Sequence, residues 1–272
     1  MILVAILTLL LFGGSAPVPA DTLPNGCTAS TPTKGRRLER TIDVEGTSRT
    51  YILDVPDGVQ PGTPVPLLFD FHGFRHSGAG VWKVSAFKDI AEREPFITVY
   101  PEGMSVHMLD LDGPGWEIFK IDGNRDLAFV RAMLAAIDDA YCIDRARVFS
   151  TGFSNGAFFS HLLACTMADR FAAVAPVAGG SLDLPCTPSR PVPIMIHHGR
   201  KDPVVKVERA RTLRDAWVEK NGCGERSDES CEWRRGCRAG ADVAYCENDD
   251  EHHWPPPATE RIWSFFKAHP MR

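Results

Sequence analysis

Positive charge is not in excess in this 272-residue sequence, since 30 lysine and arginine residues are outnumbered by 35 aspartate and glutamate residues. A nucleic-acid-binding protein needs a basic surface to neutralise phosphates, so we expect no nucleic-acid partner. Internal repeats, low-complexity segments and long linkers are also missing, which favours a single domain. Hydrophobic residues make up 44% of the chain, and this content excludes a disordered protein and permits a substantial core.

Long apolar runs are scarce as well. No stretch after the N-terminal region approaches the roughly 18 apolar residues that span a bilayer, so we expect no membrane-embedded part. The apolar residues 2–12, followed by small residues at 13–16, are typical of a signal peptide, and we place cleavage after Ala20. Because no lysine or arginine precedes this run, an uncleaved buried helix or strand is the alternative. We therefore predict a signal peptide over residues 1–20 and a secreted, extracellular protein.

The C-x-x-C spacing of zinc ribbons and redox dithiols is absent. Eight cysteines are present nevertheless, and an even number in a secreted chain favours disulfide bonds. Eight cysteines allow 105 complete pairings, so the sequence does not settle the connectivity. We expect a Cys165–Cys186 bridge and two bridges within the cluster 223–246. The full set is Cys27, Cys142, Cys165, Cys186, Cys223, Cys231, Cys237 and Cys246.

Strand-like and helix-like segments alternate along most of the chain. Short apolar runs predict strands at residues 51–55, 67–71, 96–100, 147–151, 171–178 and 193–197. Helical spacing predicts helices around residues 128–137, with Asp126 as N-cap, and at 157–167, 207–220 and 260–268. This alternation predicts an α/β three-layer sandwich with a mostly parallel central sheet. We expect an N-terminal arm at 21–39, one catalytic domain at 40–272, and a cysteine-pinned loop at 223–246.

The sequence Gly152-Phe153-Ser154-Asn155-Gly156 matches the G-x-S-x-G pattern and lies between a predicted strand and a predicted helix. That context places the serine on a sharp turn with its hydroxyl exposed, and the glycines leave room for close backbone contacts. Ser154 is therefore the candidate nucleophile, and the Asn155 backbone N–H is a candidate oxyanion donor. An ordinary glycine turn is the structural alternative.

A serine nucleophile needs a base that is oriented by a carboxylate. In the chain order nucleophile, acid, histidine, Asp202 follows the strand at 193–197, and the pair His252-His253 comes later. The second oxyanion donor is expected after the strand at 67–71, where Gly73 allows the Phe74 N–H to approach the substrate. The alternatives are a turn aspartate, a solvated histidine pair and a plain strand-ending turn.

Several segments together resemble the secreted feruloyl esterase and polyhydroxybutyrate depolymerase group of α/β-hydrolases, which is also described as carbohydrate esterase family 1-like. The resemblance runs from about residue 40 to the C-terminus. It rests on the serine motif and on His72-Gly73, Tyr100-Pro101-Glu102-Gly103, Tyr141-Cys142-Ile143-Asp144, Phe171-Ala172-Ala173-Val174, His198-Gly199 with Asp202, and His252-His253-Trp254-Pro255.

This resemblance implies an α/β-hydrolase fold and a Ser-His-Asp triad that acts through an acyl-enzyme. It assigns the catalytic histidine to His252, because the family's histidine lies two residues before the tryptophan. It implies a feruloyl esterase that acts on hydroxycinnamoyl esters of plant xylan, with a feruloylated polysaccharide or oligosaccharide as partner and no metal or organic cofactor. We expect Trp82, Trp116 and Trp254 to line a substrate groove, the alternative being that they pack in the core.

Two segments differ from the family pattern. The acidic residues 249–251 replace a glycine before His252, and we expect them to favour the imidazolium and to raise the working pH. The bulky residues 74–76 follow Gly73 and are expected either to narrow the acyl pocket or to bring a cation near the substrate.

Other functions remain open at this point. A polyhydroxybutyrate depolymerase or an acetylxylan esterase would use the same mechanism, and an inactive hydrolase-fold binding module is a further alternative. A glycosidase needs two facing carboxylates, and no motif provides them. A metal site built from His72 with His76, or from His197 with His198, is less favoured than a scaffold role at strand ends.

Overall fold

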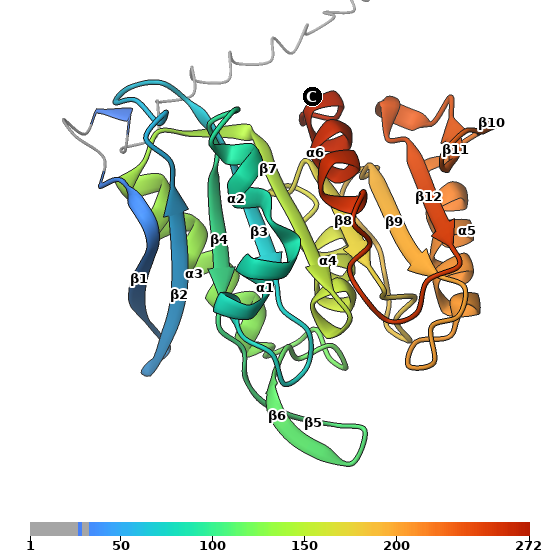
Figure 1. Ribbon diagram of the computed structural model, residues 1–272, viewed down its shortest axis with the longest axis horizontal. Helices are drawn as coiled ribbons and strands as arrows, with labels where there is room; N and C mark the ends of the chain where they lie inside the picture. Colours follow the sequence, from blue (N-terminus) through green and yellow to red (C-terminus); the bar gives the residue numbers. More distant parts are fainter. Residues whose placement is uncertain (1–26, 29–32) are drawn as a thin grey trace, which may run out of the picture.

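The computed structural model describes residues 27–28 and 33–272, so the predicted signal peptide lies outside the described residues. One ten-stranded sheet forms the centre of the molecule (Figure 1). Its strands, in spatial order, are β1 (Gly35–Val44), β2 (Thr47–Val55), β4 (Ile97–Pro101), β3 (Val65–Phe71), β7 (Ile143–Phe153), β8 (Ala173–Val177), β9 (Ile194–Gly199), β12 (Val243–Asn248), β11 (Glu232–Arg235) and β10 (Glu225–Asp228).

The six strands from β4 to β12 in this order run parallel, and the outer strands at both ends pair antiparallel. Every residue of β3, β4, β8 and β9 is buried, as expected for parallel strands that are covered on both faces. The predicted α/β-hydrolase sandwich with a mostly parallel sheet is therefore confirmed.

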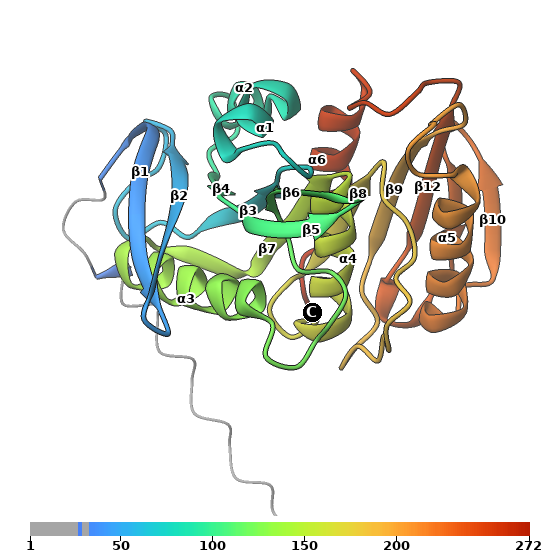
Figure 2. The same ribbon diagram turned by 90° about the horizontal axis from the view of Figure 1, so that it is seen from below.

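Helices cover both faces of the sheet (Figures 1 and 2). One face carries α3 (Arg125–Ala140), α4 (Asn155–Thr166) and α5 (Val207–Asn221), whose apolar side chains form the larger core with the sheet. The other face carries α1 (Gly78–Ser85), α2 (Phe87–Ala91) and α6 (Ala258–Ala268), and the last two build a second core. A hairpin of β5 (Met104–Met108) and β6 (Leu111–Gly115) projects from the carboxyl edge of the parallel strands.

The prediction that Asp126 is the N-cap of α3 is wrong. Asn124 caps this helix, because its side-chain oxygen accepts from the amides of Asp126 (2.9 Å) and Leu127 (3.1 Å). Asp126 instead forms a buried ion pair with Arg49 at 2.8 Å. Asn124 and Asp126 are both residue types that cap helices. The sequence does not distinguish them, because the ion pair that Asp126 forms with Arg49 is a tertiary contact.

Two boundaries also differ from the expectation. Residues 35–39 were assigned to the N-terminal arm, but they form the first half of β1, which pairs with β2. The predicted loop at residues 223–246 instead contains β10, β11 and most of β12. β12 pairs parallel with β9, and β11 and β10 then extend the sheet by antiparallel pairing. β10 and β11 consist mostly of charged residues, so their sequences lack the apolar signature of the central strands.

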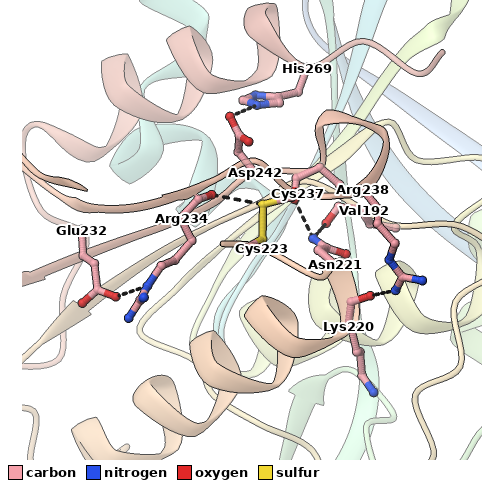
Figure 3. The surroundings of a disulfide bond; sticks show 11 residues. Val192, Lys220, Asn221, Cys223, Glu232, Arg234, Cys237, Arg238, Asp242 and His269 are labelled. Atoms are coloured by element: carbon pink, nitrogen blue, oxygen red, sulfur yellow. Dashed lines mark hydrogen bonds and ion pairs between the residues drawn. A yellow bond between two sulfur atoms is a disulfide. The ribbon is translucent and has the colours of Figure 1, made fainter. Parts of the chain in front are cut away.

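The eight cysteines form four disulfides, Cys27–Cys142, Cys165–Cys186, Cys223–Cys237 and Cys231–Cys246. The second pair and the two bridges inside the cluster match the expected pairing. Figure 3 shows the Cys223–Cys237 bridge just beyond the end of α5, next to Asn221, whose amide donates to Val192 O at 2.9 Å. Within residues 33–272, no helix is long and apolar enough to cross a membrane.

Candidate active site

Ser154 lies on the sharp turn between β7 and α4 at the carboxyl edge of the sheet. Its backbone has φ 54° and ψ −117°, a strained conformation that non-glycine residues rarely adopt outside functional sites. A Cβ on Gly152 would lie 2.6 Å from Gly156 O, and one on Gly156 would collide with Phe71 O. Both positions therefore require glycine, and the turn holds the Ser154 hydroxyl above the sheet.

Ser154, His252 and Asp202 are brought together from three separate loops. His252 Nε2 lies 2.9 Å from Ser154 Oγ, and His252 Nδ1 lies 2.6 Å from Asp202 Oδ2. The other carboxylate oxygen, Oδ1, accepts from the amides of Val204 and Val205 at 2.8 Å each. These bonds fix Asp202, which in turn orients the imidazole so that Nε2 is free to accept the serine proton.

The neighbouring His253 is directed elsewhere. Its Nε2 lies 3.4 Å from Asp250 Oδ2, and its side chain is half exposed. The acidic residues before His252 also have other partners: Asp249 pairs with Arg200, and Asp250 accepts from Asn248. The expected effect of these acids on the working pH stays a prediction.

The two candidate oxyanion donors lie on either side of the serine. A Cβ built on Gly73 would come within 3.4 Å of Ser154 Cβ, which places the segment after β3 against the nucleophile. In that segment Pro114 O accepts from the Arg75 amide at 2.7 Å, whereas none of the described residues accepts from the Phe74 amide. The Asn155 amide is the first N–H of α4, so no helical carbonyl accepts from it. Both amides can therefore donate to a developing oxyanion.

The other histidines near the strand ends are buried in the scaffold, except the exposed His76. Burial lowers the pKa of His72 to about 4 and that of His197 to about 3. His198 Nε2 donates to Val205 O at 2.8 Å and so supports the Asp202 loop. Burial therefore keeps the imidazoles of His72 and His197 neutral at ordinary pH.

One cluster of metal-type ligands occurs in the described part of the chain. The ligand atoms of His161, Cys165 and Cys186 lie within 4.8 Å of one another. Cys165 and Cys186 are joined as a disulfide, so neither sulfur is available as a thiolate ligand. This donor set does not fit a metal ion.

A cavity of about 460 Å³ opens on Ser154 and His252. Leu109, Phe119 and Val204 form part of its wall and are 69%, 65% and 53% exposed, so the mouth of the cavity is an apolar rim. Polar side chains are few in the wall. The lining comprises Gly73, Phe74, His76, Met108, Leu109, Ile118, Phe119, Phe153, Ser154, Asn155, Phe158, Leu182, Asp183, Leu184, Val204, Val205, Arg209 and His252.

None of the three predicted groove tryptophans lines this cavity, and that expectation is corrected. Trp116 is 1% exposed and donates to His72 O at 2.8 Å. Trp254 is buried against Phe87, and its indole donates to Thr259. Trp82 contacts the cationic groups of Arg37 and Lys88. Each tryptophan packs within the scaffold instead.

The sequence interpretation missed the hairpin β5–β6 and the loop that follows it, which supply Met108, Leu109, Ile118 and Phe119 to the cavity. No catalytic motif marks these residues. The available signal was the alternation of apolar residues at Met104, Val106 and Met108, which has the period of two that is typical of a strand.

Comparisons with known proteins give the family and the fold of the chain. A family model described as esterase PHB depolymerase matches residues 49–223. Feruloyl esterase D of Neurospora crassa is 28% identical over 95% of both chains, and feruloyl esterase C of Emericella nidulans is 30% identical over 79% of this chain and 75% of its own. The solved structure of an acetyl xylan esterase from Aspergillus awamori aligns with a TM-score of 0.67 at 15% identity, covering 85% of this chain and 99% of that structure.

Proposed function

Because the chain belongs to the esterase PHB depolymerase family, we propose that it is a secreted serine carboxylesterase that hydrolyses hydroxycinnamoyl esters of plant cell-wall xylan. The observation that carries this proposal is the continuous hydrogen-bonded relay from Asp202 through His252 to Ser154, which opens on an apolar cavity. Four disulfides support an extracellular location, because such bonds persist in oxidising compartments.

The first half of the reaction forms an acyl-enzyme. Ser154 Oγ attacks the ester carbonyl carbon while His252 Nε2 takes the hydroxyl proton. The carbonyl oxygen becomes an oxyanion that accepts from the Phe74 and Asn155 amides, and each such donor contributes on the order of 3–4 kcal/mol to the transition state. The carbon–oxygen bond to the alcohol then breaks, and His252 donates the proton to the departing alcohol oxygen.

The second half releases the acid. A water molecule attacks the acyl carbon, and His252 takes one of its protons. The resulting oxyanion returns to the same two amides. The bond to Ser154 Oγ then breaks, His252 returns the proton to the serine, and the free carboxylic acid leaves. Asp202 keeps the imidazole oriented and stabilises its charged form in both halves.

The shape of the cavity supports an aromatic acyl group. Phe74, Phe119, Phe153 and Phe158 contribute aromatic walls, and an acetyl group would leave most of the space of about 460 Å³ unfilled. The feruloyl esterases of Neurospora crassa and Emericella nidulans are similar over most of this chain, which also supports this substrate class.

The test is an ester panel run on the wild type, on Ser154→Ala, and on Ser264→Ala as a control for an exposed serine on α6. We expect methyl ferulate to give the highest kcat/KM, and we expect only Ser154→Ala to abolish turnover. Faster hydrolysis of acetylated xylan or of a short hydroxybutyrate oligomer would reassign the enzyme to an acetylxylan esterase or a depolymerase. No turnover of any ester would favour the binding-module alternative.

A further inference from the structure

The base of the hairpin β5–β6 lies between the two candidate oxyanion donors. Trp116 directly follows this hairpin and contacts both sides. Its indole N–H donates to His72 O at 2.8 Å, its backbone N–H donates to Asn155 Oδ1 at 2.7 Å, and its carbonyl accepts from Asn155 Nδ2 at 3.2 Å. One residue thus links the end of β3 to the start of α4.

His72 extends this linkage to the Phe74 amide. Its buried ring accepts from the Gly103 amide at Nε2 (2.9 Å), and its Nδ1 lies 2.7 Å from Gly73 O, to which it donates. The Gly73 carbonyl and the Phe74 N–H belong to the same planar peptide group and point in opposite directions. Fixing the carbonyl oxygen therefore fixes the direction of the Phe74 N–H.

Packing holds the Trp116 ring in one place. The ring stacks on Phe159 of α4, with 5.3 Å between the two ring centroids. It contacts Phe71 of β3 edge-on, with a centroid distance of 5.0 Å and an interplanar angle of 82°. The preceding Gly115 allows a close approach to α4, because a Cβ there would lie 2.9 Å from Asn155 Oδ1. The ring has no free space in which to move independently of β3 and α4.

We propose that Trp116 is a positioning residue that sets the separation and direction of the Phe74 and Asn155 amides, so that both donate to the same oxyanion. This inference rests on the proposed esterase function. Trp116 does not line the cavity and acts through two chains of hydrogen bonds, one through His72 and Gly73 and one through the Asn155 side chain.

The test compares Trp116→Phe with Trp217→Phe. Trp217 is a matched control because it is fully buried on α5 and its indole nitrogen has no hydrogen-bond partner in the described part of the chain. For each variant we measure kcat and KM on methyl ferulate, the melting temperature, and the Ki of phenylboronic acid. This acid forms an anionic tetrahedral adduct with Ser154 Oγ, and one boron-bound hydroxyl oxygen then lies where the oxyanion forms.

We expect Trp116→Phe to lower kcat by about 10- to 100-fold and to raise the Ki of the boronic acid by a similar factor, with KM within about twofold. Trp217→Phe should keep kcat and Ki within about twofold, whatever it does to the melting temperature. The inference is overturned if Trp116→Phe keeps wild-type kcat and Ki, or if kcat falls while Ki does not change. An inactive wild type would instead refute the proposed function itself.

A second pair of variants tests the His72 branch. Asn at position 72 has an amide donor near the position of Nδ1, whereas Leu has none. We expect His72→Asn to retain a kcat several-fold above that of His72→Leu, with the same order in boronic acid affinity. Equal losses in both variants would show that the donor to Gly73 O has no positioning role.

Discussion

The two sides of the active site are held in place by different interactions. On the nucleophile side, Ser154 and the oxyanion donors are fixed by buried backbone contacts, by close approaches at Gly152 and Gly156, and by the packed ring of Trp116. On the acid–base side, His252 lies on a loop between β12 and α6 that is tied down by ion pairs and a disulfide.

The ion pairs that hold the strand before His252 lie near the protein surface. Glu247 on β12 accepts from Arg200 at 2.8 Å and from both nitrogens of the Arg211 fork. The hydrogen bonds from Arg211 lower the pKa of Glu247 to about 2, so this carboxylate is charged at any working pH. Cys246, on the same strand, is bonded to Cys231. The nucleophile side therefore depends on packing, whereas the strand that leads into His252 depends on charge pairs and a disulfide.

The largest expected effect separates the two adjacent histidines. His252→Ala removes the group that contacts both Ser154 and Asp202, so we expect kcat to fall by about 10⁴-fold or more. His253→Ala removes only a half-exposed contact to Asp250 and should keep kcat within a few-fold of the wild type. Steady-state kinetics on methyl ferulate measures both. The opposite result would assign the base to His253.

Removing disulfides is expected to affect the two regions differently. The Cys231–Cys246 and Cys223–Cys237 bridges close loops of nearly equal length, with sequence separations of 15 and 14. Replacing either pair with serine should therefore cost about 3 kcal/mol of unfolding free energy. Only the Cys231/Cys246 variant loosens the strand that leads into His252, so only this variant should lose kcat, by several-fold. Equal kcat in both variants, measured below their melting temperatures, would contradict the assigned role of β12.

Asp70, on the nucleophile side, is expected to make the free energy of unfolding depend on pH. This residue is fully buried on β3. Burial raises its pKa to about 7, and a hydrogen bond with Ser85 opposes this shift to a smaller extent. Because the folded pKa lies above the unfolded value, the fold loses stability as pH rises from about 4 to 7. Asp70→Asn removes this loss, so the stability of the variant relative to wild type should rise by about 4 kcal/mol over that range and then level off.

Thermal melts from pH 4 to pH 8 measure this difference, with Asp122→Asn as an exposed control. The buried His72 has the opposite effect on stability, because its pKa is lowered from 6.5 to about 4 in the folded protein. As pH falls below about 6.5, the unfolded chain binds a proton at this residue before the folded protein does, and the fold loses stability. Only the difference between variant and wild type therefore isolates Asp70. A difference that is constant across pH would show that the carboxyl is ionised in the folded protein.

The sequence was most informative where local geometry restricts the residue type. The turn at Ser154 needs glycine on both sides, and the central strands need continuous apolar runs, so both were predicted correctly. The fold class and the family follow from these segments. The parallel arrangement also explains why loops distant in sequence meet at one edge of the sheet.

Features that depend on tertiary contacts were not predicted. The sequence does not distinguish a buried tryptophan such as Trp116 from a tryptophan that lines a substrate groove. The difference depends on how the side chain packs in the folded protein. The cavity is built from segments around residues 73–76, 108–119, 153–158, 182–184 and 204–209, and no sequence motif indicates that these segments meet. The strands β10 and β11 are four residues long and mostly charged, so their sequences do not differ from that of a loop.

The most direct measurement of the central claim is covalent labelling of the protein with an aryl phosphonate ester, followed by mass spectrometry of the peptide that contains residue 154. The Ser154–His252–Asp202 relay predicts one adduct, on Ser154, which is absent in Ser154→Ala. This adduct should form at least about 100-fold faster in wild type than in His252→Ala, because general-base catalysis contributes a factor of about that size. An adduct on another residue, or equal labelling rates in wild type and His252→Ala, would contradict the account.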